Sequence, residues 1–192
     1  MPIEFVGFTA DRRITGTIPL ADDRLSDMLN SVSRIVLRDA TVGDLVEGGR
    51  PAVGDVTLPV GDLVAVIGTG RRGAESQRRR TSVRRVKLGL GRYVVTGLLH
   101  VPPNQDAMAW IANPVDLLAG RDVLVPITQA TISYDCVDVA TTEEHETILV
   151  NRSRTAWLDV EEKTLDDGGD DDPGDGTGRS RYVKDFTGSV AD

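Results

Sequence analysis

Cysteine, histidine and aromatic residues are scarce in this chain of 192 residues. The single cysteine, Cys136, excludes an internal disulfide. Because the chain has only two histidines, His100 and His145, the usual cysteine and histidine zinc sites cannot be assembled. Aromatic residues make up 4% of the chain while glycines number 20, a balance that favours strands and turns over a helical bundle. We therefore expect no structural metal and no cofactor.

Long apolar runs are also missing. No stretch approaches the roughly 18 to 20 residues that a membrane-spanning helix needs. The first residues, MPIEFVGFTADRR, lack the basic start and apolar centre of a signal peptide. We therefore expect a cytoplasmic protein without membrane contact, with a length that suits one medium domain or two small ones.

Charge is strongly segregated along the chain, whose net charge is −8. Residues 71–92 hold nine basic residues and one acidic residue, whereas residues 159–192 hold four basic and eleven acidic ones. Blocks of like charge are typically solvated loops or tails. The sequence predicts an arginine-rich linker loop over 71–83. It also predicts a flexible acidic tail over 159–192, because DDGGDDDPGDGTG at 166–178 has no apolar residue to offset the entropy of ordering it.

An internal repeat organises the rest, since four blocks recur in the same order in both halves. The blocks pair 14–20 with 95–101, 25–30 with 108–113, 35–42 with 125–132, and 64–71 with 148–154. The first pair, ITGTIPL and VTGLLHV, shares a threonine and a glycine, and the second pair reads as a short helix ending in asparagine. The sequence of each half therefore predicts the order strand, strand, short helix, strand, strand. The first copy forms one expected domain over 1–70, and the second copy forms another over 84–158.

Repeats of about 70 residues are marginal as isolated folds, so the two should share a core. We expect an α+β, β-rich fold of two tandem ββαββ repeats related by a pseudo-twofold axis, with their sheets packed together. One continuous sheet is the alternative. Gly16 and Gly97 fall on the inward strand faces, where the helix or the other repeat should approach closely.

The order of RITGTIPL, a polar turn, RLSDMLN and RIVLRDATV over residues 12–42 resembles a bacterial family of small β-rich domains of unknown function with an RLSDxLN-type helix. The resemblance is weaker over 93–132. It implies a fold unit and supplies no catalytic residue.

Two catalytic or cofactor patterns can be drawn and are not favoured. Gly68, Gly70 and Gly73 spell the G-x-G-x-x-G of a dinucleotide site. However, the next residues, AESQRRRTSVRR, are too polar for a helix that packs on a sheet, and no acid follows at the usual distance of about 20 residues. Cys136 and His145 could be drawn as nucleophile and base, but YDCVDV alternates like a strand with a half-buried cysteine.

The basic segment supplies the candidate residues for binding nucleic acid or an acidic partner. They are Arg71, Arg72, Arg78, Arg79, Arg80, Arg84, Arg85 and Lys87. No aromatic residue lies between Phe8 and Tyr93 for base stacking. The favoured function is a non-enzymatic protein-interaction or scaffold module of a bacterial cytoplasm, which binds a protein partner or self-associates. The alternatives are phosphate or nucleic-acid binding through the arginine-rich loop, and an enzyme or small-ligand binder with a site between the repeats.

Overall fold

The computed structural model describes residues 2–20, 24–45, 51–68, 81–102, 106–111, 123–136, 139–161 and 180–183, and every structural statement below concerns these residues. The first half contains β1 (Pro2–Phe8), β2 (Arg12–Pro19), α1 (Leu25–Ser31), β3 (Arg34–Asp44), β4 (Ala52–Pro59), η1 (Val60–Asp62) and β5 (Ala65–Ile67). The second half contains β6 (Ser82–Leu90), β7 (Tyr93–Val101), α2 (Ala107–Ile111), β8 (Leu124–Cys136), β9 (Val139–Asn151), η3 (Arg152–Arg154), β10 (Trp157–Glu161) and β11 (Ser180–Val183). The prediction of a β-rich chain with few helices is confirmed.

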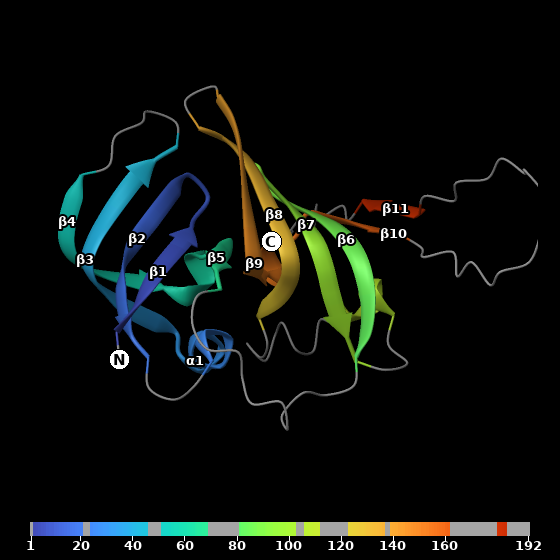
Figure 1. Cartoon of the computed structure of the whole chain (residues 1–192), viewed down its shortest axis with the longest axis horizontal. Coiled ribbons are helices and arrows are strands. Elements are labelled where there is room, and N and C mark those ends of the chain that lie inside the picture. The colour runs from blue at the N-terminus through green and yellow to red at the C-terminus, as the bar shows by residue number, and fades with distance from the viewer. Residues whose placement is uncertain are drawn as a thin grey trace, which may run out of the picture.

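All described strands form one antiparallel sheet in the order β11-β10-β6-β7-β8-β9-β5-β1-β2-β3-β4 (Figure 1). The halves meet where β9 pairs with β5, so the expectation of two packed sheets is wrong and the alternative of one continuous sheet is confirmed. The pseudo-twofold axis is wrong as well. A twofold would join like strands, whereas the fifth strand of the first half meets the fourth strand of the second.

Burial on both faces explains why β5 and β9 lie in the middle of the sheet. Along β5, Ala65 and Ile67 belong to one core, whereas Val66 between them belongs to the other. Leu149 on β9 likewise faces the core opposite to that of its neighbours. An apolar run without alternation is typical of a strand covered on both sides. Each half therefore contributes side chains to the core of the other.

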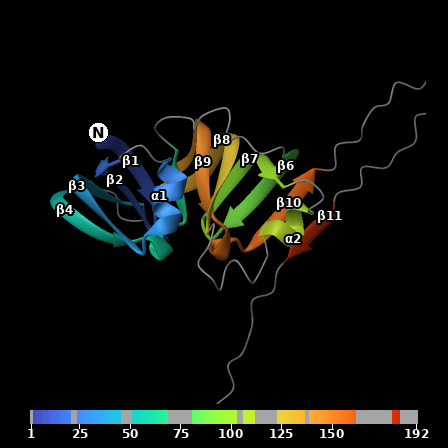
Figure 2. The same cartoon turned by 90° about the horizontal axis from the view of Figure 1, so that it is seen from below.

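Figure 2, which views the molecule from below, shows both helices on the near side, α1 in front of the first half and α2 in front of the second. In α1, Leu25 and Leu29 are buried in the core of the first half. In α2, Ile111 is buried in the core of the second half, and the Asp106 carboxylate accepts from the N–H of Ala109, which satisfies one free donor of the first turn.

Gly16 and Gly97 each lie at a shift in strand register, one between β2 and β3 and the other between β7 and β8. A Cβ atom on Gly97 would lie 2.6 Å from Cγ2 of Ile127 and 2.9 Å from the carbonyl oxygen of Thr128. These glycines therefore face the backbone of the next strand at a bulge, and not a helix or the other half as expected.

Replacing Gly97 with alanine should lower the free energy of unfolding by about 1 to 3 kcal/mol, because the backbone of β8 would have to move to admit the methyl group. Urea denaturation followed by circular dichroism measures the change. Gly61→Ala is the matched control, since a Cβ atom there meets no atom within 4 Å. Equal stability of the two variants would contradict the bulge contact.

Two further expectations need correction. Each half has a fifth strand, which the sequence did not predict. Strand β5 pairs with β1 in the first half, and the equivalent strand in the second half is β10, which pairs with β6. The alignment of block 64–71 with block 148–154 is therefore wrong, because residues 148–154 end β9 and form η3. The predicted tail from residue 159 also contains the end of β10 and all of β11. Apolar residues on either side of residue 159, including Leu158 and Val160, pack on the core and hold β10 in the sheet.

Candidate functional site

The basic candidate residues divide between described and undescribed parts of the chain. Arg71, Arg72, Arg78, Arg79 and Arg80 lie outside the described residues, and Arg84, Arg85 and Lys87 lie exposed on β6.

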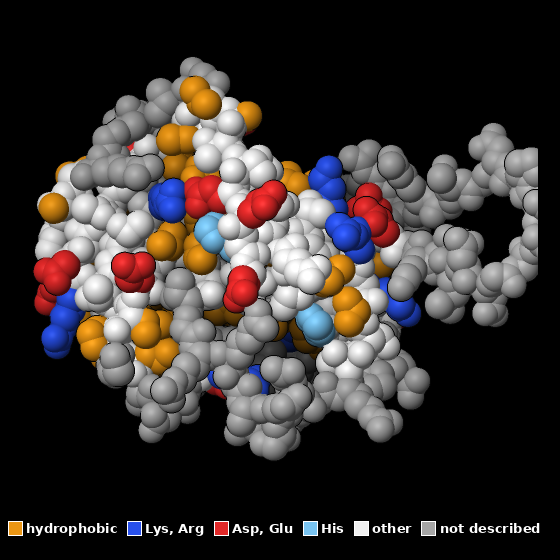
Figure 3. All heavy atoms as spheres, viewed as in Figure 1, with side chains coloured by type: hydrophobic (Ala, Val, Ile, Leu, Met, Phe, Trp, Pro, Cys, Tyr) orange, Lys and Arg blue, Asp and Glu red, His pale blue; other side chains and the backbone are white. Residues whose placement is uncertain are grey.

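Strand β10 places acidic residues beside those of β6. The guanidinium Nε of Arg85 lies 3.5 Å from a carboxylate oxygen of Glu161, and Lys87 is directly opposite Asp159 in the strand register. Figure 3 shows acidic and basic side chains next to each other on the described part of this face. Cross-strand neighbours of opposite sign lower the local positive charge, so Arg85 and Lys87 make a poor phosphate site. Counting charge along the sequence missed this because β10 is distant from β6 in the chain.

The glycine-rich pattern has a structural role at its first position. Gly68 follows β5, its N–H donates to the carbonyl oxygen of Thr147 at 2.9 Å, and a Cβ atom there would lie 3.0 Å from the Thr147 side chain. Gly68 thus allows β5 and β9 to approach each other. Gly70 and Gly73 lie outside the described residues.

Cys136 and His145 do not form a nucleophile and base. Cys136 pairs with Val139 at the end of the β8–β9 hairpin, whereas His145 pairs with Ala130. Ala130 and Cys136 are six positions apart along β8, which at about 3.3 Å per residue is about 20 Å.

A group of bonded polar side chains lies where the halves meet, and its contacts with Arg13 and Tyr134 were not found from the sequence. Arg13 on β2 makes a two-pronged ion pair with Glu143 on β9, with Nη1 2.8 Å from Oε1 and Nη2 3.3 Å from Oε2. The Tyr134 hydroxyl donates to Oε1 of the same carboxylate, and Nε2 of His145 lies 3.2 Å from Oε2. Both oxygens of Glu143 therefore have partners within the protein, and the cluster ties β2 to β9.

Three aromatic rings pack beneath this cluster. The ring centroids of Phe8, Tyr93 and Tyr134 lie 5.4 to 5.8 Å apart, and the Arg13 guanidinium lies 5.7 Å from the Phe8 centroid. Burial, followed by the hydrogen bond to Glu143, raises the pKa of Tyr134 to about 12. Burial likewise raises the pKa of Tyr93, whose hydroxyl donates to the carbonyl oxygen of Thr9. Both phenols are thus held neutral, which suits packing and hydrogen bonding more than proton transfer.

The raised pKa of Tyr134 predicts how stability depends on alkaline pH. An ordinary tyrosine titrates near pH 10.0, so between pH 10 and about 12 the unfolded chain loses a proton that the folded chain keeps. The contribution of this phenol is fully present below pH 10 and is lost as the pH rises toward 12. Denaturation series at several pH values should show a shallower fall for Tyr134→Phe, and tyrosinate absorbance should lose one late-titrating group.

A wild-type tyrosinate titration completed near pH 10 would contradict the burial of Tyr134. Tyr134→Phe is itself the matched variant, because it keeps the ring in the aromatic group and removes only the hydroxyl that donates to Glu143.

Two asparagines bridge the halves near the same junction. The Asn30 side chain, at the end of α1, donates to the carbonyl oxygen of Leu124 and accepts from its N–H, both at 2.9 Å. The fully buried Asn151, at the end of β9, donates from its side chain to the carbonyl oxygen of Leu63 at 2.8 Å. The sequence flagged Asn30 as a helix end, but only the fold shows that it reaches across the junction.

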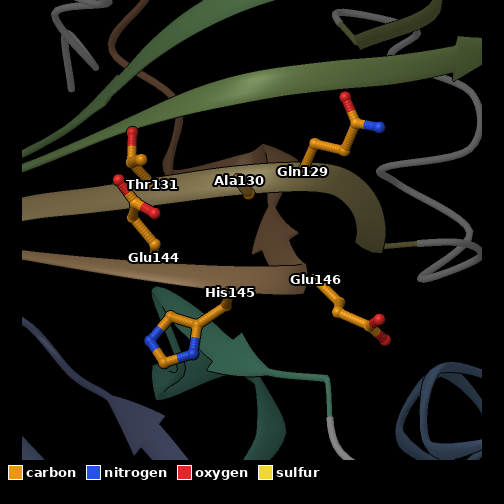
Figure 4. Close-up of a pocket in the computed structure, with 6 residues that line it drawn as sticks. All are labelled: Gln129, Ala130, Thr131, Glu144, His145 and Glu146. Atoms are coloured by element: carbon orange, nitrogen blue, oxygen red, sulfur yellow. The ribbon is translucent and has the colours of Figure 1, made fainter.

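A surface hollow of about 440 Å³ lies over β8 and β9. It is lined by Gln129, Ala130, Thr131, Glu144, His145 and Glu146. In Figure 4, His145 points away from Gln129 and Thr131, so these polar side chains do not converge on one point. The hollow therefore offers no set of groups aimed at a single ligand atom.

The outer strand β4 has a different character. Val32, Val36 and Val53 are three of the five exposed large apolar side chains among the described residues, and they lie just after α1, on β3 and on β4. Among the described strands, β4 has a neighbour on one side only. An open sheet edge with apolar residues beside it can pair with another chain.

Among the described residues, no group of three or more histidine, cysteine, aspartate or glutamate side chains could hold a metal ion, and no helix is both long and apolar enough to cross a membrane. Comparison of the chain with protein-family models, with curated proteins and with solved structures finds no match. The features that bear on function are therefore the sheet edge and the internally bonded polar cluster.

Proposed function

We propose that the protein is a non-enzymatic interaction module of the bacterial cytoplasm that self-associates through an edge of its sheet. The observation that carries the proposal is the open edge at β4, with Val36 and Val53 each about half exposed (51% and 49%). In contrast, the Glu143 carboxylate, at the centre of the polar cluster, is bonded to Arg13, Tyr134 and His145. Groups with those bonds already made are poorly placed to bind a substrate.

We further propose that the module arose as two tandem copies of one ββαββ unit, each extended by a fifth strand. Two residues aligned by the repeat, Asp39 and Gln129, share the rare left-handed backbone, with φ of 49° and 48°. The aligned glycines also make the same approach: a Cβ atom on Gly16 or Gly97 would lie 2.9 Å from the carbonyl oxygen of Arg38 or Thr128, respectively.

The ends of the two units support the same proposal. The N–H of Leu63 donates to the carbonyl oxygen of Val60 at 3.1 Å, and that of Thr155 donates to the carbonyl oxygen of Arg152 at 3.3 Å. One residue further on, Val64 and Ala156 donate to the leading strands β1 and β6 at 2.7 and 2.8 Å. These matches relate residues 60–64 to residues 152–156.

Light scattering of the full chain from micromolar to near-millimolar concentration, at low and high salt and with and without RNA, tests the function. We expect the mean mass to double with concentration and to be insensitive to RNA. We also expect added salt to leave the association intact, because strand pairing and apolar contact are not screened as charge pairs are. A chain that stays monomeric throughout would contradict self-association. Salt-sensitive RNA binding without self-association would favour the arginine-rich loop as the functional element.

A further inference from the structure

We infer that β4 pairs with β4 of a second copy in antiparallel fashion about a twofold axis at Val56, which extends the sheet across two molecules. The inference rests on the proposed function and specifies its partner and its site. The pairing strand is residues 55–57 of each copy, on the side of β4 that faces away from β3.

The backbone donors of β4 alternate between its two sides. Val60, which follows β4, donates its N–H to the carbonyl oxygen of Ser33, in the same register that pairs Leu58 with Ile35. Alternation then directs the N–H groups of Val56 and Leu58 toward β3 and those of Asp55 and Thr57 outward. Asp55 and Thr57 are both exposed, so these outward groups lie at the surface.

A twofold axis at Val56 satisfies the outward groups in pairs. Asp55 of one copy lies opposite Thr57 of the other, and each such pair exchanges two backbone hydrogen bonds, which gives four across the interface. The two Val56 residues then face each other as a pair without hydrogen bonds, the kind in which side chains come closest. No like charges lie directly opposite each other in this register.

The apolar surroundings of β4 fit this occupant. Val56 is partly buried against the core of the first half, as are Ile3, Met28 and Val42. A second copy brings an identical valine to the same face of the sheet. The pairing therefore continues an incompletely covered core from one molecule into the next, which gains apolar burial beyond the four backbone bonds.

A different arrangement would pair β4 with β10 of a second copy, in the way that β9 pairs with β5 within the chain. Pro59 argues against it. At the place of Pro59, β9 has Asn151, whose backbone N–H donates to the carbonyl oxygen of Val64 and whose side chain donates to that of Leu63. Proline has no N–H and cannot make the first bond. The β10 edge is also paired with β11.

Cysteine cross-linking tests the register in the full chain. In a Cys136→Ser background, Val56→Cys should form a disulfide-linked dimer on mild oxidation, because an antiparallel pair without hydrogen bonds places the two Cα atoms about 4.5 Å apart. Val53→Cys is the matched control on the same strand. In this register two such cysteines are offset by six residues, about 20 Å, and should give no dimer.

Thr57→Pro supplies an independent measurement, since it removes an outward N–H that an edge strand can lose without unfolding. Light scattering should show the mass doubling in the wild type and not in Thr57→Pro, while circular dichroism shows both folded. Equal cross-linking at positions 53 and 56, or a dimer that persists in Thr57→Pro, would overturn this interface while leaving self-association in place. A wild type that stays monomeric at every concentration, without a Val56→Cys cross-link, would overturn both.

Discussion

Replacing Asn151 with alanine should lower the free energy of unfolding by about 2 to 4 kcal/mol. The side chain is fully buried, donates to the carbonyl oxygen of Leu63 and accepts from both the N–H and the hydroxyl of Ser153. Truncation leaves the Leu63 carbonyl oxygen without this donor in the interior, at a cost of about 1 to 3 kcal/mol, and the cavity left by the buried side chain adds to the loss, whereas Ser153 is exposed and its groups can bond to water. Urea denaturation followed by tryptophan fluorescence measures the loss.

Thr155→Val is the matched control in the same turn. Its hydroxyl is buried and has no hydrogen-bond partner among the described residues, so its replacement by a methyl group should leave stability unchanged or raise it slightly. If Asn151→Ala were as stable as the wild type, this would contradict a stabilising role for the buried hydrogen bonds of Asn151 at the junction.

Replacing Leu29 with alanine should cost about 2 to 4 kcal/mol, the usual penalty for deleting a leucine side chain from a packed core. Leu29 has no exposed surface and holds α1 against the core of the first half. A seven-residue helix is too short to be stable alone, so it depends on this contact. Thermal unfolding followed by circular dichroism should show a clearly lower midpoint.

Met28→Ala is the comparison within the same helix, because Met28 is only partly buried and its truncation should cost less. A loss for Met28→Ala as large as that for Leu29→Ala would mean that α1 packs with another face toward the sheet. The same measurements on both variants keep the effect of helix propensity nearly constant.

The local patterns of the sequence predicted much of the secondary structure. Alternating apolar residues placed β2 and β7, and the segment after the polar turn predicted a helix over 25–30, where the structure has α1 at Leu25–Ser31. The arrangement of the sheet did not follow from these patterns. Apolar runs such as VAVI predict burial on both faces, but whether another sheet or another core covers the second face depends on pairing between strands far apart in the chain.

The candidate site was less predictable for the same reason. The basic residues of β6 could be counted, yet their acidic neighbours on β10 come about 70 residues later and are revealed only by the register. Arg13 and Glu143 are 130 positions apart, and no local spacing marks them as a pair. Charge counts describe segments, whereas the chemistry of a surface depends on which segments become neighbours.

The sharing of cores across β5 and β9 also affects how the chain can be made. Val66 on β5 pairs with Leu149 on β9, so the partner strand leaves the ribosome about 80 residues after β5. At about 5 to 20 residues per second, several seconds of synthesis separate the two strands. During that interval the first half has an unpaired apolar edge, and Leu124 and Leu149 are missing from its core. Completion of the fold therefore has to wait until β9 has been synthesised, and until then the nascent first half is exposed to aggregation and to chaperones.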